Sequence, residues 1–101
     1  LQLSEDCRRI SVPEAETILR CVQEALTNAA KHSSAQRLSV ALRRDGACWK
    51  LDIRDDGDKT PEVANGGGLR GMQERFSGLG GTLSWSATAG MPLCASWPVR
   101  E

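Results

Sequence analysis

The spacing of the apolar residues changes along the chain, and this change limits what the chain can fold into. From 13 to 32 they recur every three or four positions, which predicts an amphipathic helix. The stretch SVPE at 11–14 predicts its start, because Ser11 and Glu14 can cap the first turn reciprocally and proline is tolerated there. The core side of this helix is expected to carry Ile18, Leu19, Val22, Ala25, Leu26 and Ala29.

A polar stripe runs along the same predicted helix. At about 100° per residue, Glu24, Asn28 and Lys31 fall nearly opposite the apolar side. They offer a carboxylate, an amide oxygen and an ammonium, which suit a base, a ligand for a hard cation and a phosphate contact. Taken alone, the stripe is better explained as the solvated side of a surface helix.

Strict alternation of apolar and polar residues, typical of half-buried strands, replaces the helical spacing in four later stretches. The first two alternating stretches flank an Asp-Gly turn, which predicts an antiparallel hairpin. A second helical stretch follows a long glycine-rich loop and ends at a Gly-Gly pair. The predicted elements are a helix at 13–32, strands at 37–43 and 49–54, a loop at 55–68, a helix at 69–79 and strands at 82–86 and 93–99, with an additional N-terminal strand near 1–3.

This order of elements predicts an α+β fold, a two-layer α/β sandwich whose mixed or antiparallel sheet carries the helices on one face. With 101 residues, 40% of them apolar, the chain is long enough for one core. Residues 1–101 are therefore expected to form a single domain. We expect this domain to be a fragment of a longer protein.

The charges of the chain exclude several kinds of partner. Thirteen basic and thirteen acidic residues balance and are mixed along the sequence, which predicts no nucleic-acid binding and no direct membrane contact. The four cysteines lack the spacing of a zinc site, so reduced thiols in a cytoplasmic protein are expected. The sequence contains no signal peptide and no apolar run of membrane-spanning length.

Two carboxylates and a glycine follow the second predicted strand. Gly57 has no Cβ to keep a flat ring away from the backbone, and Asp55 or Asp56 could accept a hydrogen bond from an exocyclic amine. An ordinary Asp-Asp-Gly turn explains the same residues and is the better explanation of this motif taken alone.

Three glycines at 66–68 precede the second predicted helix. The first N–H groups of a helix lack intrahelical partners and carry partial positive charge, so this helix start is a candidate phosphate site. The spacings of a P-loop and of a Rossmann fingerprint are absent. His32, after the first helix, could act as a ligand or a base, although a cap for the last carbonyls is favoured.

Four motifs taken in order resemble the catalytic ATP-binding domain of sensor histidine kinases. They are EALTNAAKHS at 24–33, RDDGD at 54–58, GGGLRGMQERFSGLGGTL at 66–83 and AGMPLCASWP at 89–98. The resemblance is strongest to the nitrate-sensor and sugar-phosphate-sensor subgroup, within a superfamily that includes gyrase, the Hsp90 chaperones and MutL. It implies a Bergerat-type sandwich in which ATP and Mg²⁺ lie under a short lid, here 58–67.

The resemblance also implies roles for individual residues. Glu24 corresponds to the catalytic position that polarises the nucleophile, Asn28 to the Mg²⁺ ligand, and Asp55 to the aspartate that bonds the N6 amine of adenine. The ATP-binding set that it implies is Asn28, Lys31, His32, Asp55, Gly57, Gly66, Gly68, Leu69 and Met72.

Three departures from the family pattern accompany the resemblance. Lys59 and Met91 stand where the pattern has a glycine and a threonine, and no histidine corresponds to the phosphoacceptor. The implied function is transfer of the γ-phosphoryl group of ATP to a histidine on a separate dimerisation domain of the same protein, which then signals to a response regulator. We expect the cytosolic part of an inner-membrane sensor. The alternatives are a degenerate regulatory module of the same fold and a serine-directed anti-sigma kinase.

Overall fold

The computed structural model describes residues 2–3, 9–32, 37–57, 67–86 and 92–99. Within these ranges every predicted helix and strand is present, and most bounds differ from the prediction by only one or two residues. The elements are β1 (Gln2–Leu3), α1 (Val12–His32), β2 (Leu38–Asp45), β3 (Cys48–Asp55), α2 (Gly67–Gly78), β4 (Thr82–Trp85) and β5 (Leu93–Pro98).

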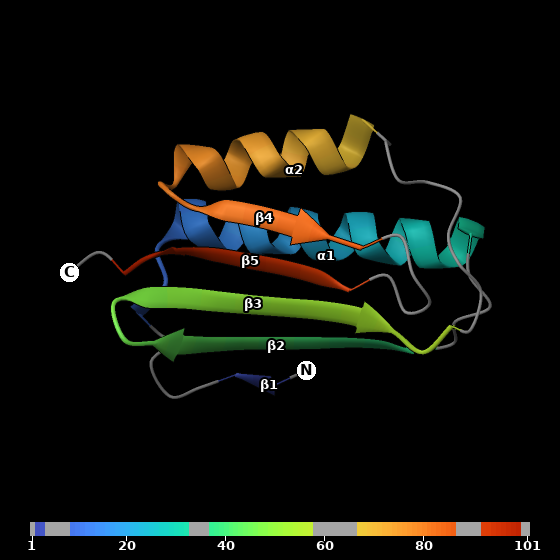
Figure 1. Cartoon of the computed structure of the whole chain (residues 1–101), viewed down its shortest axis with the longest axis horizontal. Coiled ribbons are helices and arrows are strands. Elements are labelled where there is room, and N and C mark those ends of the chain that lie inside the picture. Colours follow the sequence, from blue (N-terminus) through green and yellow to red (C-terminus); the bar gives the residue numbers. More distant parts are fainter. Residues whose placement is uncertain (1, 4–8, 33–36, 58–66, 87–91, 100–101) are drawn as a thin grey trace.

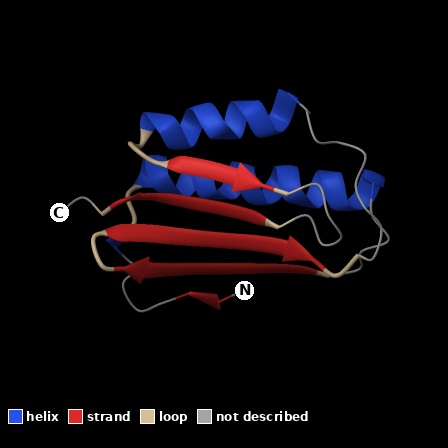
Figure 2. Cartoon of the chain, viewed as in Figure 1, coloured by secondary structure: helices blue, strands red, loops and turns tan. Residues whose placement is uncertain are grey.

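The five strands form one sheet in the order β1-β2-β3-β5-β4. Strand β1 runs parallel to β2, and the other neighbours are antiparallel, so the sheet is mixed. Both helices lie on the same face of this sheet, as Figures 1 and 2 show. The predicted α+β sandwich with helices on one face is therefore confirmed.

The core lies between the helices and the inward face of the central strands. Alternate residues of β3 and β5 are almost fully buried, as the predicted alternation requires. Phe76 of α2 packs on Trp97 of β5 with ring centroids 5.2 Å apart. The largest fully buried side chains are Trp49, Trp97, Phe76, Leu51, Ile53, Leu69 and Cys21.

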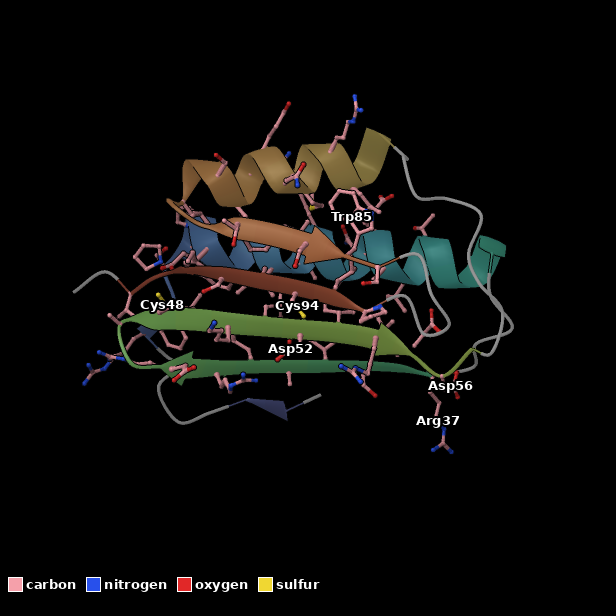
Figure 3. The ribbon with its side chains drawn as sticks, in the orientation of Figure 1. Arg37, Cys48, Asp52, Asp56, Trp85 and Cys94 are labelled. Carbon is pink, nitrogen blue, oxygen red and sulfur yellow. The ribbon has the colours of Figure 1, made fainter. Side chains whose placement is uncertain are left out.

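The uncovered face of the sheet is polar, which suits a surface open to solvent. Asp52 of β3 lies near its centre and accepts hydrogen bonds from Arg43 Nη1 at 2.7 Å and from Cys94 Sγ at 3.2 Å. Burial, and then the hydrogen bond to Asp52, raise the pKa of the Cys94 thiol. Cys94 and Asp52 lie side by side in Figure 3.

The buried side of α1 differs from the one that its apolar residues predict. Leu19 and Leu26 were expected in the core, but their side chains are 58% and 51% exposed. The buried line instead consists of Glu14, Thr17, Cys21 and Ala25. At 100° per residue, Glu24 lies only about 60° from Cys21 around the helix, so its predicted position opposite the core is wrong.

The contacts at the start of α1 explain why the helix is rotated about its axis relative to the prediction. The predicted capping box is present: the Ser11 N–H donates to Glu14 Oε1 at 3.0 Å, and the Glu14 N–H donates to Ser11 Oγ at 3.3 Å. The second oxygen of Glu14 accepts a 2.6 Å hydrogen bond from the indole N–H of Trp97. Because the capping carboxylate also bonds a residue of β5, Glu14 faces the sheet. This contact fixes which side of α1 is buried.

Helix α2 ends in a Schellman motif. The Gly81 N–H donates to the carbonyl of Phe76 at 2.8 Å, and the Gly80 N–H donates to that of Ser77 at 2.9 Å. Gly80 has a φ of 79°, a left-handed conformation that favours glycine. A Cβ on Gly81 would overlap the Ser96 carbonyl oxygen and lie 2.6 Å from Trp97 Cβ. The predicted Gly-Gly stop is confirmed, and its second glycine also allows close packing on β5.

We predict that Glu14→Ala destabilises the domain by about 2–4 kcal/mol, since it removes a helix cap and leaves the buried indole N–H without its charged acceptor. Urea unfolding followed by tryptophan fluorescence measures the loss. Glu16→Ala, an exposed change in the same turn, is the control and should shift stability by no more than about 0.5 kcal/mol. Equal losses in the two variants would contradict the role assigned to Glu14.

We predict that Gly81→Ala costs about 3 kcal/mol or more, because the new methyl group meets backbone and Cβ atoms of β5 that cannot move aside. Gly78→Ala is the matched control, since nothing lies within 4 Å of the added Cβ. That variant should be neutral or stabilising by up to about 1 kcal/mol. Thermal unfolding of both proteins tests the prediction, and similar melting temperatures would disprove the close approach.

Candidate functional site

The predicted site segments meet at one end of the sandwich. In Figure 1 the C-terminal half of α1, the C-terminal end of β3 and the N-terminus of α2 all lie at the right-hand end. Helices α1 and α2 contact each other, and α1 also contacts β3. The fold thus brings three segments that are far apart in sequence to one edge of the molecule.

The two carboxylates after β3 make different contacts. Asp55 is half-buried, and its Oδ1 accepts the Gly57 N–H at 2.8 Å, which fixes an Asx turn. Asp56 is exposed, and its Oδ1 accepts the Arg37 N–H at 3.0 Å. Its own N–H donates to the Arg37 carbonyl at 3.2 Å, so Asp56 ties this turn to the chain just before β2 (Figure 3). The Asp-Asp-Gly turn is therefore present, and it orients Asp55.

The polar stripe of α1 lies beside the buried line of the helix. Glu24 is half-buried, one turn after the fully buried Cys21. Asn28 and Lys31 follow on the last turns of α1, and His32 is its final residue. The side chains of these last three residues lie outside the described part of the structure. Because α1 is continuous to His32, its backbone carries all four positions toward the same end.

Helix α2 begins two residues earlier than predicted, at Gly67, and includes Gly68 in its first turn. That turn contains no acidic residue, so no carboxylate of the helix itself neutralises the positive end of its dipole. Leu69 is fully buried and Met72 is 8% exposed, so both anchor the helix start in the core. Gly66, most of the predicted lid, Lys59 and Met91 lie outside the described residues.

One side chain at this end belongs to a predicted strand but to none of the predicted site motifs. Trp85 is half-buried at the C-terminal end of β4 and lies close to α2 in Figure 3. With Gln73, Leu83 and Ser84 it lines an open hollow of ≈ 240 Å³ between α2 and β4. The Gln73 amide donates to the Leu83 carbonyl at 3.3 Å across this hollow. Residues 82–86 were predicted only as a strand, and no sequence motif indicated the hollow.

The thiols in the described part of the chain are free. Cys21 differs from Cys48 and Cys94 because it lies in the core. Burial, with a smaller contribution from the charge of Glu24, raises its pKa from 9.0 to about 11. Cys21 is therefore a neutral packing residue near neutral pH.

Comparison with known proteins agrees with this geometry. Residues 14–98 match the family described as histidine kinase-, DNA gyrase B-, and HSP90-like ATPase. The chain belongs to this ATPase family. The match begins at the capping glutamate of α1 and ends at the last residue of β5, so it covers the two helices and four of the five strands.

Curated relatives of this ATPase domain are sensor histidine kinases. The chain is 38% identical over 87 residues to sensor histidine kinase YxjM of Bacillus subtilis, covering 84% of the chain and 21% of the relative. It is 38% identical over 93 residues to the signal transduction histidine-protein kinase/phosphatase UhpB of Salmonella typhimurium, covering 90% of the chain and 19% of that protein. The chain thus spans about a fifth of the length of these relatives.

Solved histidine kinase structures share the fold of this ATPase domain. The histidine kinase domain of the Erythrobacter litoralis EL346 blue-light activated kinase aligns with a TM-score of 0.63 at 28% identity, over 86% of the chain and 45% of that structure. The ATP binding domain of PrrB from Mycobacterium tuberculosis aligns with a TM-score of 0.68 at 24% identity, over 85% of the chain and 69% of that structure.

Within the described residues, neither helix is long and apolar enough to span a membrane. In the same part of the chain, no three His, Cys, Asp or Glu side chains are grouped as metal ligands. Magnesium that is shared with a triphosphate needs only one or two protein ligands, so such a group is not required for it.

We predict that the Cys21 thiol makes stability depend on pH in the alkaline range. A folded-state pKa above the unfolded value stabilises the protein below about pH 9, and this contribution is lost as pH rises through about 11. A shift of about two units corresponds to roughly 2–3 kcal/mol. Urea unfolding between pH 7.5 and 10.5 should show a steeper decline in wild type than in Cys21→Ala or Cys21→Val. Parallel declines in all three proteins would refute the assignment.

Proposed function

We propose that this chain is the ATP-binding catalytic domain of a sensor histidine kinase, which binds Mg·ATP and supplies its γ-phosphoryl group to a histidine on a separate dimerisation domain. One observation carries the proposal. In a member of this ATPase family, an oriented aspartate at the end of β3 shares one end of the sandwich with the glycine-fronted start of α2 and with the polar stripe of α1.

The adenine end of the proposed site is Asp55 with Gly57. The Gly57 N–H holds Oδ1 of Asp55 at 2.8 Å, which fixes the direction of the carboxylate. A carboxylate is an acceptor only, so it favours the N6 amine of adenine over the O6 carbonyl of guanine at the same place. Gly57 lets the base lie close to the backbone because it has no Cβ.

The triphosphate end of the proposed site is the start of α2. The N–H groups of its first turn, which follows Gly66 and includes Gly68, lack partners within the helix and so suit a dianionic phosphate. Leu69 and Met72 contribute by packing this turn against the core, which keeps its N–H groups in one direction. Lys31 and His32, near the end of α1, are proposed to add positive charge from the other helix.

The metal and the base are proposed to come from the polar stripe of α1. The amide oxygen of Asn28 is a hard ligand that suits Mg²⁺, and the remaining ligands would be phosphate oxygens and water. When bound, Mg²⁺ would neutralise charge on the triphosphate. Glu24, half-buried one turn before Asn28, is proposed to polarise the attacking imidazole and to accept its proton.

The proposed reaction is a transfer of the γ-phosphoryl group. A nitrogen of the acceptor histidine forms a bond to the γ-phosphorus, the bond between this phosphorus and the β,γ-bridging oxygen breaks, and ADP leaves. Such transfer depends mainly on positioning and on charge stabilisation. The phosphohistidine would then serve a response regulator, and we place the domain on the cytoplasmic side of a membrane sensor.

We predict that Asp55→Asn weakens Mg·ATP binding about 10- to 100-fold, the effect of losing a hydrogen bond to a charged acceptor of about 1.5–3 kcal/mol. Asparagine can still accept the Gly57 N–H, so the turn should survive. Isothermal titration with Mg·ATP and Mg·GTP measures both affinity and base preference.

Asp56→Asn is the matched control for this experiment, because it changes the neighbouring carboxylate in the same turn. Its affinity for Mg·ATP should stay within about twofold of wild type. Equal affinity of wild type and Asp55→Asn would exclude the adenine contact. Failure of wild type to bind Mg·ATP at all would exclude the proposed function.

A further inference from the structure

Two hydrogen bonds at one residue pair tie the turn after β3 to the chain just before β2. The Asp56 N–H donates to the Arg37 carbonyl at 3.2 Å, and the Arg37 N–H donates to Asp56 Oδ1 at 3.0 Å. Leu38 and Asp55 form the last residue pair of the β2–β3 ladder, so Arg37 and Asp56 stand one step beyond it. Both lie at the site end of the hairpin in Figure 3. We call these two bonds the hairpin clamp.

The hairpin clamp differs from a regular step of an antiparallel ladder. Opposed residues of a hydrogen-bonded pair normally exchange two bonds between their backbones. Here the Asp56 side chain makes one of the two, so its carboxylate takes the acceptor place that a backbone carbonyl has in a regular pair. The Arg37 N–H is therefore satisfied without requiring the backbone of Asp56 to continue the strand.

This substitution allows the Asx turn to begin directly at the end of β3. The Gly57 N–H donates to Asp55 Oδ1 at 2.8 Å, and an Asx turn bends the chain as a backbone turn does. A ladder that continued through Asp56 with backbone bonds alone would keep the chain extended at that residue. The Asp56 carboxylate thus lets the ladder end and the turn begin at the same place.

The position of the hairpin clamp suggests a local role. Arg37 and Asp56 are both exposed, and substitutions at exposed positions usually change the stability of a domain little. Their bonds instead fix the residue that lies between Asp55 and Gly57, the two proposed adenine contacts. An acceptor that is already held in its bound direction loses less conformational freedom when the ligand arrives, and this raises affinity.

We propose that Asp56 is a positioning residue for the nucleotide: without touching ATP, it holds the Asp55 carboxylate in the direction of the N6 amine. This inference rests on the proposed function, because it concerns the same site. The property that it requires of residue 56 is a side-chain oxygen that accepts the Arg37 N–H, and a negative charge is not required. Asparagine should therefore replace Asp56, and alanine should not.

Titration of the chain with Mg·ATP tests the proposal. We expect Asp56→Ala to weaken binding about 3- to 10-fold, the effect of one hydrogen bond. Asp56→Asn keeps the acceptor oxygen and should restore the affinity of wild type. Asp52→Ala is the control, because it removes an exposed carboxylate that bonds Arg43 across the same two strands but lies outside the turn. Its affinity for Mg·ATP should equal that of wild type.

A nucleotide without the amine separates positioning of Asp55 from a general loss of structure. Purine riboside triphosphate lacks the N6 amine of ATP, so the Asp55 carboxylate has no donor to meet there. Competition titration should show that Asp56→Ala binds its magnesium complex as tightly as wild type does. An equal fold-loss for both nucleotides would overturn the proposal.

Amide hydrogen exchange measures the turn without nucleotide. The Gly57 N–H should exchange at least about fivefold faster in Asp56→Ala than in wild type or Asp56→Asn, because its acceptor is no longer held. Unchanged exchange at Gly57 would overturn the proposal, and so would unchanged Mg·ATP affinity of Asp56→Ala when wild type binds. Failure of wild type to bind Mg·ATP would remove the proposed function and this role together, which distinguishes it from failure of this role alone.

Discussion

A buried carboxylate at the start of α1 connects the helical layer to the sheet. Glu14 caps the helix through one oxygen and accepts the Trp97 indole N–H through the other, at 2.6 Å, across 83 residues of sequence. Trp97 also packs on Phe76 of α2, so the bond links both helices to β5. Burying a carboxylate is costly unless it is well bonded, and these bonds offset that cost only when α1 has one particular rotation.

The rotation of α1 about its axis determines which of its residues face the sheet and which face solvent. With Glu14 and Cys21 turned inward, Glu24 lies on the flank of the buried line rather than on the outer side of α1. A helix rotated to bury Leu19 and Leu26 would instead carry Glu24 out toward solvent. The half-buried position of Glu24 and the exposure of Leu19 and Leu26 both follow from this orientation of α1.

Most of the fold could be predicted from the sequence, because the periods of two and 3.6 residues are local properties. The hairpin turn, the capping box and the Gly-Gly stop are local too, and all three are present in the structure. The buried side of α1 could not be predicted in this way. Counting apolar residues favours Leu19 and Leu26, whereas the true core line begins with Glu14 and Thr17, which are polar. The partner that makes Glu14 a core residue is distant in sequence.

Part of the candidate site could also be predicted, because it depends on residues that are adjacent in sequence. The Asx turn at Asp55 follows from adjacent residues, and the resemblance to a known family supplied the order of the motifs. The hollow beside Trp85 depends on how α2 crosses the edge strand β4, which no short motif encodes.

The two helix starts lie at opposite ends of the sandwich and differ in charge, and this difference bears on where an anion can bind (Figure 1). At the start of α1, Glu14 accepts the Ser11 N–H and places a carboxylate at the positive end of the dipole. The first turn of α2 has no acidic residue and two glycines instead. A phosphate near α1 would be repelled by Glu14, whereas one near the start of α2 would meet no carboxylate from the first turn of that helix. The capping box thus does more than start a helix: it places a carboxylate at the start of α1, and this makes the start of α2, at the end where Asp55 is fixed, the better candidate for the proposed triphosphate contact.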